Sequence, residues 1–201
     1  MNLKNRFALA VITAAVAFSV CAAEPPSSIK EVIDARCAVC HGREGESANA
    51  IYPRLAAQHP DYMVKQLMDF RDGRRKGDAM PEMAKDLTDP QIRELAAWFS
   101  SRPPGSRKPR DPDLAGVGRY IFTQGNPYSG VAACTSCHGE NGYGTQTLPR
   151  LAGQHPVYLE TQLKEFGSRA RTNDNAIMHT IASKLTELER HAVAAYIGGL
   201  Q

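Results

Sequence analysis

Apolar residues recur at a spacing of three or four positions in several stretches of the chain, and this spacing predicts amphipathic helices. One stripe follows Thr88 and consists of Ile92, Leu95, Ala96 and Phe99. The other stripes are Met63, Leu67 and Phe70 in the first half and Leu159, Leu163 and Phe166 in the second. We expect these last two helices to end near Gly73 and Gly167. No stretch shows the strict alternation of a half-buried strand, so the pattern predicts an all-α protein.

Two of the expected helices begin with a capping box. Thr88 is followed three positions later by Gln91, and Thr186 is followed in the same way by Glu189. In this arrangement the hydroxyl accepts a backbone N–H, and the longer side chain reaches back to the first residue. Shorter helices are expected at residues 29–36 and 116–122, each ahead of a pair of cysteines.

The two halves of the chain are copies of each other. Residues 53–60, Pro-Arg-Leu-Ala-Ala-Gln-His-Pro, match residues 149–156, Pro-Arg-Leu-Ala-Gly-Gln-His-Pro. The offset between matching positions stays between 96 and 98 residues, which indicates a duplicated unit. We therefore expect two small helical domains, residues 24–102 and 113–201. Residues 103–112 between them are rich in Pro and charge, which predicts a semi-rigid, extended linker.

The beginning of the chain has the composition of a targeting segment. Two basic residues precede an apolar run over residues 7–20, and small residues follow. This is typical of a cleaved secretory signal peptide, here residues 1–23, and predicts a periplasmic protein. An uncleaved membrane anchor and a lipid anchor at Cys21 are the alternatives, although Val20 is larger than the residue that lipoprotein processing favours.

Charge and cysteine usage narrow the functional classes. The formal net charge is +3 for the full chain and +1 once the two basic residues of the segment 1–23 are removed. Neither domain carries the large basic excess that nucleic-acid binding requires, so we expect no nucleic-acid partner. Apart from Cys21, every cysteine lies in one of two identical motifs, and no disulfide is needed to account for them.

The motif Cys-x-x-Cys-His occurs twice and predicts covalent attachment of haem c, because two thiols can bond the porphyrin vinyl groups while the adjacent His ligates iron. Its residues are Cys37, Cys40, His41, Cys134, Cys137 and His138. Zinc and a redox dithiol are the competing interpretations. The wide separation of the two pairs and the His directly after each favour haem. We therefore predict two covalently bound haem c groups.

A methionine follows each motif at nearly the same distance. Met80 lies 39 residues after His41, and Met178 lies 40 residues after His138. Each also precedes the Leu-Thr pair of a capped helix by seven positions. We predict iron ligation by His41 and Met80 in the first domain and by His138 and Met178 in the second. The rivals, which have no counterpart in the other copy, are Met83 and His179.

Residues of the repeated segment are candidates for supporting the ligands. The carbonyls of Pro53 and Pro149 are expected to accept the Nδ1–H of the two iron-ligating histidines, which would fix the rings. Arg54 and Arg150 could pair with haem propionates, or could be solvated surface charges.

The repeated segment also contains a histidine in each copy, His59 and His155, directly before a proline at a helix start. We expect these side chains to make local hydrogen bonds at the helix entrance rather than to ligate iron.

Nearly end to end after residue 23, the chain resembles the dihaem cytochrome c4 family. The resemblance rests on the two Cys-x-x-Cys-His motifs, the Pro-Arg-Leu segments, Met80 and Met178, and the stretch Arg171-Thr-Asn-Asp174. It implies two tandem class I cytochrome c domains, each wrapped around one low-spin His/Met haem, with propionate edges facing across the interface. The first copy departs from the second, since Gly-Asp-Ala precedes Met80 where Asn-Asp-Asn-Ala-Ile precedes Met178.

The resemblance implies an electron carrier rather than an enzyme, acting in the periplasm between redox protein donors and acceptors and towards a haem-copper terminal oxidase. Any membrane association would come through these partners. The alternative is a cytochrome subunit of a periplasmic dehydrogenase complex, such as a flavocytochrome c sulfide dehydrogenase. A dihaem peroxidase needs an iron with an available coordination position, and two matched methionines argue against it.

Overall fold

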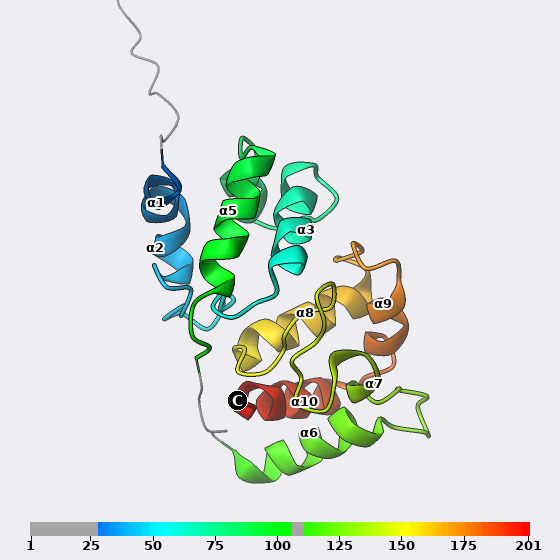
Figure 1. Cartoon of the computed structure of the whole chain (residues 1–201). Helices are drawn as coiled ribbons and strands as arrows, with labels where there is room; N and C mark the ends of the chain where they lie inside the picture. The colour runs from blue at the N-terminus through cyan, green and yellow to red at the C-terminus, as the bar shows by residue number, and fades with distance from the viewer. Residues whose placement is uncertain (1–27, 106–110) are drawn as a thin grey trace, which may run out of the picture.

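The computed structural model describes residues 28–105 and 111–201. The predicted signal peptide at residues 1–23 lies outside the described residues, as do residues 106–110 of the predicted linker. Figure 1 shows two groups of helices, one from each half of the chain, lying against each other. In the described ranges no strand forms, and one isolated antiparallel bridge joins Asn126 to Val131. The all-α prediction is confirmed.

The first group begins with a continuous helical stretch made of α1 (Ile29–Val32), a π-helical turn (Ile33–Cys37) and α2 (Ala38–His41). It continues with α3 (Pro60–Arg71), α4 (Met80–Ala84) and α5 (Asp89–Ser100). The predicted stripes on α3 and α5 form the core together with the first helical stretch. The buried core residues are Val32, Ile33, Met63, Phe70, Ala84, Leu87, Ile92, Leu95, Ala96 and Phe99.

The second group contains α6 (Pro112–Gln124), α7 (Thr135–His138), α8 (Pro156–Ser168), α9 (Ile177–Ala182) and α10 (Glu187–Gly199). Its core is separate from the first and lies mainly between α6, α8 and α10. The buried residues are Ile121, Phe122, Val131, Leu159, Leu185, Val193, Ala194 and Ile197. Two independent cores follow from the duplication.

The domain boundaries at residues 102 and 113 stay predictions. Helix α6 begins at Pro112, which is the last residue of the expected linker.

Helix ends follow local chemistry. Both predicted capping boxes form, with Thr88 accepting from the backbone N–H of Gln91 and Thr186 from that of Glu189. α3 ends at Arg71, and Gly73 follows in the left-handed region at φ 74°. In the second copy the helix continues through Gly167, and the left-handed turn is made by Arg169 at φ 64°.

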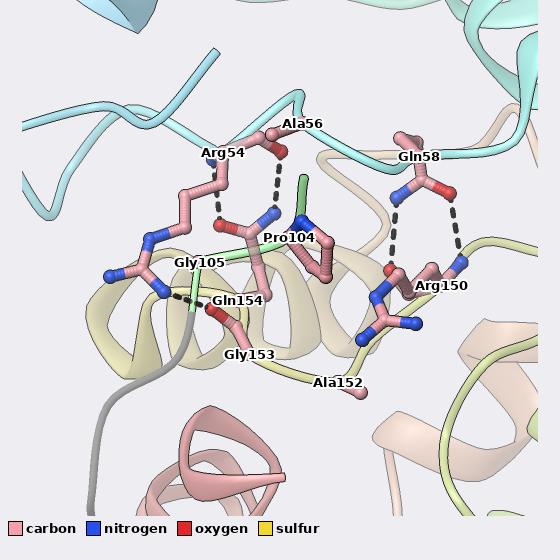
Figure 2. Close-up of a pocket in the computed structure, with 9 residues that line it drawn as sticks. All are labelled: Arg54, Ala56, Gln58, Pro104, Gly105, Arg150, Ala152, Gly153 and Gln154. Carbon is pink, nitrogen blue, oxygen red and sulfur yellow. Dashed lines mark hydrogen bonds between the residues drawn. The ribbon is translucent and has the colours of Figure 1, made fainter. Parts of the chain in front are cut away.

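The two domains are joined by side-chain amides that bind backbone, as Figure 2 shows. The Oε1 atom of Gln154 accepts the backbone N–H of Arg54 at 2.8 Å, and its Nε2 donates to the carbonyl of the same residue at 2.9 Å. Gln58 makes the reciprocal pair with the backbone of Arg150, at 2.8 and 2.9 Å. Both glutamines are buried. The interface therefore has approximate two-fold symmetry, since each copy uses the same residue to hold the other.

The repeated histidines take part in the same interface. His59 Nε2 lies 2.6 Å from the carbonyl oxygen of Tyr143, and His155 Nε2 lies 2.9 Å from that of Ser47. The prediction that these side chains bond locally at the helix entrance was wrong. Each ring contacts the other domain, because the loop before the helix faces the interface rather than its own first turn.

Candidate functional site

The first cysteine motif lies on a continuous helical stretch. Cys37 ends the π-helical turn, and Cys40 and His41 belong to α2, so the three side chains are presented within one turn. Both thiols are half-buried and His41 is buried. The helix stops there because Gly42 adopts φ 75°, a conformation that glycine reaches without steric cost. The spacing in the sequence thus places both thiols and the imidazole on one side of this helical stretch.

The second motif is built in the same way from a shorter helix. Cys134 is the N-terminal flanking residue of α7, Cys137 and His138 lie within it, and Gly139 ends it at φ 76°. Cys134 is half-buried, Cys137 is exposed, and His138 is buried. A half-buried and an exposed thiol on one turn can reach two positions along one edge of a flat group.

The imidazole of each motif is oriented by the predicted proline carbonyl. The Nδ1 atom of His41 lies 2.9 Å from the carbonyl oxygen of Pro53, and that of His138 lies 3.2 Å from the carbonyl oxygen of Pro149. This prediction is confirmed, and the contact directs Nε2 away from the loop as the free ligand atom. Burial lowers the pKa of both histidines, while the proline carbonyl acts in the opposite direction. The neutral imidazole, which is the form that ligates metals, is therefore favoured.

One thiol in each motif disfavours the thiolate form that zinc or a redox dithiol would need. Burial raises the pKa of Cys37 and of Cys134 to about 11, which keeps both protonated at neutral pH. Zinc ligation and thiol–disulfide exchange both use the thiolate. Within the described ranges, no group of three or more His, Cys, Asp or Glu residues is placed to hold a metal ion.

Met80 occupies the first position of α4 and is half-buried against the core of the first domain. Met83 is also on α4, but it is 37% exposed. The thioether that turns inward is therefore that of Met80. Its iron ligation stays a prediction, and its burial favours it over its rival.

Met178 lies on α9 and is half-buried. The Nδ1 atom of its rival His179 lies 3.0 Å from the carbonyl oxygen of Phe166, a contact of the same kind as those of His41 and His138. The backbone N–H of Met178 donates to the carboxylate of Asp174 at 2.6 Å. As in the first domain, ligation by the methionine stays a prediction, and here it rests on the matching position of Met178 in the repeat.

Two buried arginines meet at the domain interface. Arg75 stacks over the ring of Phe70 and Arg171 over that of Phe166, each at 4.4 Å from the centroid. In the part of the chain that is described, all acceptors of their hydrogen bonds are uncharged. These acceptors are Gln66, Gln162, Tyr62, Tyr158 and Asn173.

A buried cation without a carboxylate acceptor is costly, so Arg75 and Arg171 together fit an anionic group between the domains. Burial raises the pKa of Tyr158, but attraction from the two guanidinium groups outweighs it, and the net pKa lies below the usual value. Haem propionates are carboxylates, so Arg75 and Arg171 would be suited to hold them. The sequence analysis assigned no role to either arginine, although each lies five positions after a repeated phenylalanine.

Arg54 and Arg150 lie elsewhere. Arg54 is buried and donates through Nη1 to the carbonyl of Gly153, next to the linker residues Pro104 and Gly105 (Figure 2). The guanidinium of Arg150 stacks over the ring of Tyr143 at 4.4 Å. Neither is a solvated surface charge, and both pack in the interdomain contact.

No helix of the described residues is long and apolar enough to cross a membrane.

Comparisons with known proteins agree with this arrangement. A family model described as cytochrome c oxidase, cbb3-type, subunit III matches residues 24–99, and one described as cytochrome c matches residues 122–201. A cytochrome c4 of Thiocapsa roseopersicina is 44% identical over 170 residues, covering 82% of this chain and 86% of that protein. A thiosulfate dehydrogenase electron acceptor of Thiomonas intermedia is 35% identical over 181 residues, covering 88% of this chain and 81% of that protein.

Among solved structures, that of reduced recombinant cytochrome c4 from Pseudomonas stutzeri matches with a TM-score of 0.82 at 35% identity, covering 86% of this chain and 97% of that one. Two cytochrome c domains in one chain imply two covalently bound haem c groups. The two Cys-x-x-Cys-His motifs, one in each domain, and the similarity to these relatives show that the chain belongs to the cytochrome c4 family of dihaem cytochromes.

Proposed function

We propose that this dihaem electron-transfer cytochrome works in the periplasm and passes electrons between respiratory proteins, towards a terminal oxidase. In this proposal one iron is ligated by His41 and Met80 and the other by His138 and Met178. The amino-terminal segment, residues 1–23, would direct export and be removed.

The observation that carries the proposal is the matched donor set in the two copies. Each contains a buried neutral imidazole aimed by a proline carbonyl, and a half-buried methionine on a short helix. Bound haem supplies an iron that cycles between the ferrous and ferric states. If the imidazole and the thioether of each copy both bind its iron, they would leave no coordination position for a substrate. The remaining task of the chain is to hold the ligands and exclude water.

A second candidate function is that of a dedicated acceptor for one dehydrogenase. The Thiomonas intermedia relative is named a thiosulfate dehydrogenase electron acceptor, and it spans most of this chain. A periplasmic dehydrogenase that oxidises sulfur compounds, including a flavocytochrome c sulfide dehydrogenase, is therefore a reasonable donor. The same two-haem architecture serves either partner.

The ligands are tested by an optical redox titration of the haem-loaded protein, following the charge-transfer band between methionine sulfur and ferric iron. The wild type should show the band for both haems, and Met80→Ala and Met178→Ala should each remove one contribution. Met83→Leu is the matched control and should leave the band unchanged. A high-spin haem in the wild type would contradict the paired ligands and reopen the peroxidase interpretation.

Location and partners need separate measurements. Amino-terminal sequencing of protein from the periplasmic fraction should begin after Ala23, whereas an intact amino terminus in membranes would contradict the export proposal. Stopped-flow mixing with purified thiosulfate dehydrogenase and with membranes containing the terminal oxidase compares the two functions. Fast oxidation by those membranes supports the carrier, and fast reduction by the dehydrogenase alone supports the dedicated acceptor.

A further inference from the structure

The loop before Met178 is held by one carboxylate. Asp174 accepts the backbone N–H of Met178 at 2.6 Å and that of His179 at 3.3 Å through Oδ2, and that of Ala176 at 3.3 Å through Oδ1. Between these contacts, Asn175 and Ala176 adopt φ 55° and 65°, a region that costs energy for residues other than glycine. Such a turn persists only when its surroundings determine it, and here the carboxylate supplies three of the bonds.

The same loop is tied to the other domain by Asn173. Its Nδ2 donates to Gln66 Oε1 at 3.0 Å and to Asp69 Oδ2 at 2.6 Å, and its carbonyl accepts from Lys65 Nζ at 2.7 Å. All three partners lie on α3 of the first domain. The segment that leads to Met178 is therefore part of the interface and cannot move without breaking it.

The first copy lacks both the turn held by a carboxylate and the interdomain hydrogen bonds of an asparagine. In register with Asn173 and Asp174 stand Gly77, which has no side chain, and Asp78, which is exposed. Within the described ranges, Asp78 accepts no hydrogen bond from the Met80 loop. Two residues fewer separate this aspartate from its methionine, so the three-bond turn has no equivalent there.

We propose that Asp174 and Asn173 are positioning residues that lock Met178 in place, and that the first iron is the one that exchanges its methionine for a small external ligand. This inference rests on the proposed ligands Met80 and Met178. A methionine leaves iron when its loop swings outward. At the second haem that motion breaks the bonds to Asp174 and the interdomain bonds of Asn173, whereas at the first haem neither set exists.

The experiment is a titration of the oxidised, haem-loaded protein with imidazole at neutral pH, following the methionine–iron charge-transfer band. Two phases are expected, and the phase at lower imidazole concentration belongs to the first haem. The phases are assigned from the single variants Met80→Ala and Met178→Ala. Absence of the band for both wild-type haems before imidazole is added would overturn the proposed ligands and, with them, this inference.

The decisive variant is Asp174→Ala, with Asp78→Ala as its matched control from the other copy. Hydrogen bonds to a charged group contribute about 1.5–3 kcal/mol, so Asp174→Ala should tighten imidazole binding at the second haem by about tenfold or more. Asp78→Ala should change neither phase. Asp174→Asn keeps one acceptor oxygen and should fall between the wild type and Asp174→Ala.

A second variant keeps the test independent of how well Asp174→Ala folds. Asn173→Gly copies the residue of the first domain and should also shift only the second phase. A single wild-type phase, a first phase assigned to the second haem, or equal effects of Asp174→Ala and Asp78→Ala would each overturn the inference.

Discussion

The side-chain amide of Gln58 forms a closed pair of hydrogen bonds with the backbone of Arg150, at 2.9 and 2.8 Å, across the domain boundary. Gln154 repeats the arrangement in the opposite direction on Arg54. Because each amide uses both its donor and its acceptor, the pair fixes distance and orientation together. Buried polar contacts of the two glutamines thus help to set the relative position of the two haem domains.

Replacing one of these amides should loosen the interface. Gln154→Ala leaves the backbone N–H and carbonyl of Arg54 buried without these partners, and each unsatisfied group costs about 1–3 kcal/mol. We expect a lower denaturant midpoint and separate unfolding transitions for the two domains, measured by circular dichroism and haem absorbance in parallel. Gln124→Ala, at an exposed position, is the control. Coincident and unshifted transitions in Gln154→Ala would show that the amide pair adds nothing to stability.

Two glycine-to-alanine replacements on α6 should have opposite effects on the stability of the second domain, because only one of the glycines contacts α10. A Cβ at Gly118 would overlap the carbonyl oxygen of Ala192, whereas a Cβ at Gly116 on the same helix meets no atom within 4 Å. Gly118→Ala should therefore destabilise the second domain, by about 1–3 kcal/mol as for other overpacked sites. Gly116→Ala should stabilise it by about 0.5–1 kcal/mol, because alanine is the better helix former.

Both values come from denaturant unfolding of the single variants. Equal free energies of unfolding for Gly116→Ala and Gly118→Ala would contradict the close approach of the two helices.

The two interface arginines should raise the haem reduction potentials. Reduction removes one positive charge from iron, so a buried cation nearby favours the ferrous state. Arg75→Gln and Arg171→Gln should each lower a potential in a spectroelectrochemical titration. Arg93→Gln, which removes an exposed arginine on α5, should leave both potentials unchanged. Unaltered potentials in both interface variants would mean that these guanidiniums do not face the propionates.

Acid should weaken the interface through Asp69, whose side chain is 5% exposed. Burial raises the pKa of this carboxyl, but hydrogen bonds outweigh it and the net pKa lies below the usual value. The donors are Lys65, Arg74 and Asn173. A lowered folded pKa stabilises the protein above the unfolded value of about 3.9, and this stabilisation is lost as pH falls through the folded pKa.

The variant Asp69→Asn should therefore be less stable than the wild type at pH 7, and the difference should shrink below about pH 4. Urea unfolding of both proteins across this range measures it, with the exposed Asp78→Asn as control. A stability difference that stays constant with pH would show that the carboxylate charge of Asp69 is not involved.

Local features of the sequence were sufficient for much of the fold and for the chemistry of the two motifs. The capping boxes at Thr88 and Thr186 formed as predicted, because their bonds join residues only three positions apart. The carbonyls of Pro53 and Pro149 also accept from the ligand histidines, since a short loop returns to its own motif. In each case the partners are close in the chain.

Predictions failed where the partner lies in the other domain. His59 and His155 were expected to bond locally and instead reach about a hundred residues away. Arg54 packs in the interface rather than in solvent, and its pairing with a haem propionate stays a prediction. The sequence by itself determined that there are two copies, where the longer helices of each lie, and which motifs can attach haem, because these depend on spacing and local bonding. Only the tertiary structure decided how the copies face each other and which arginines and amides become buried, because burial is a property of the assembled surfaces and not of any segment.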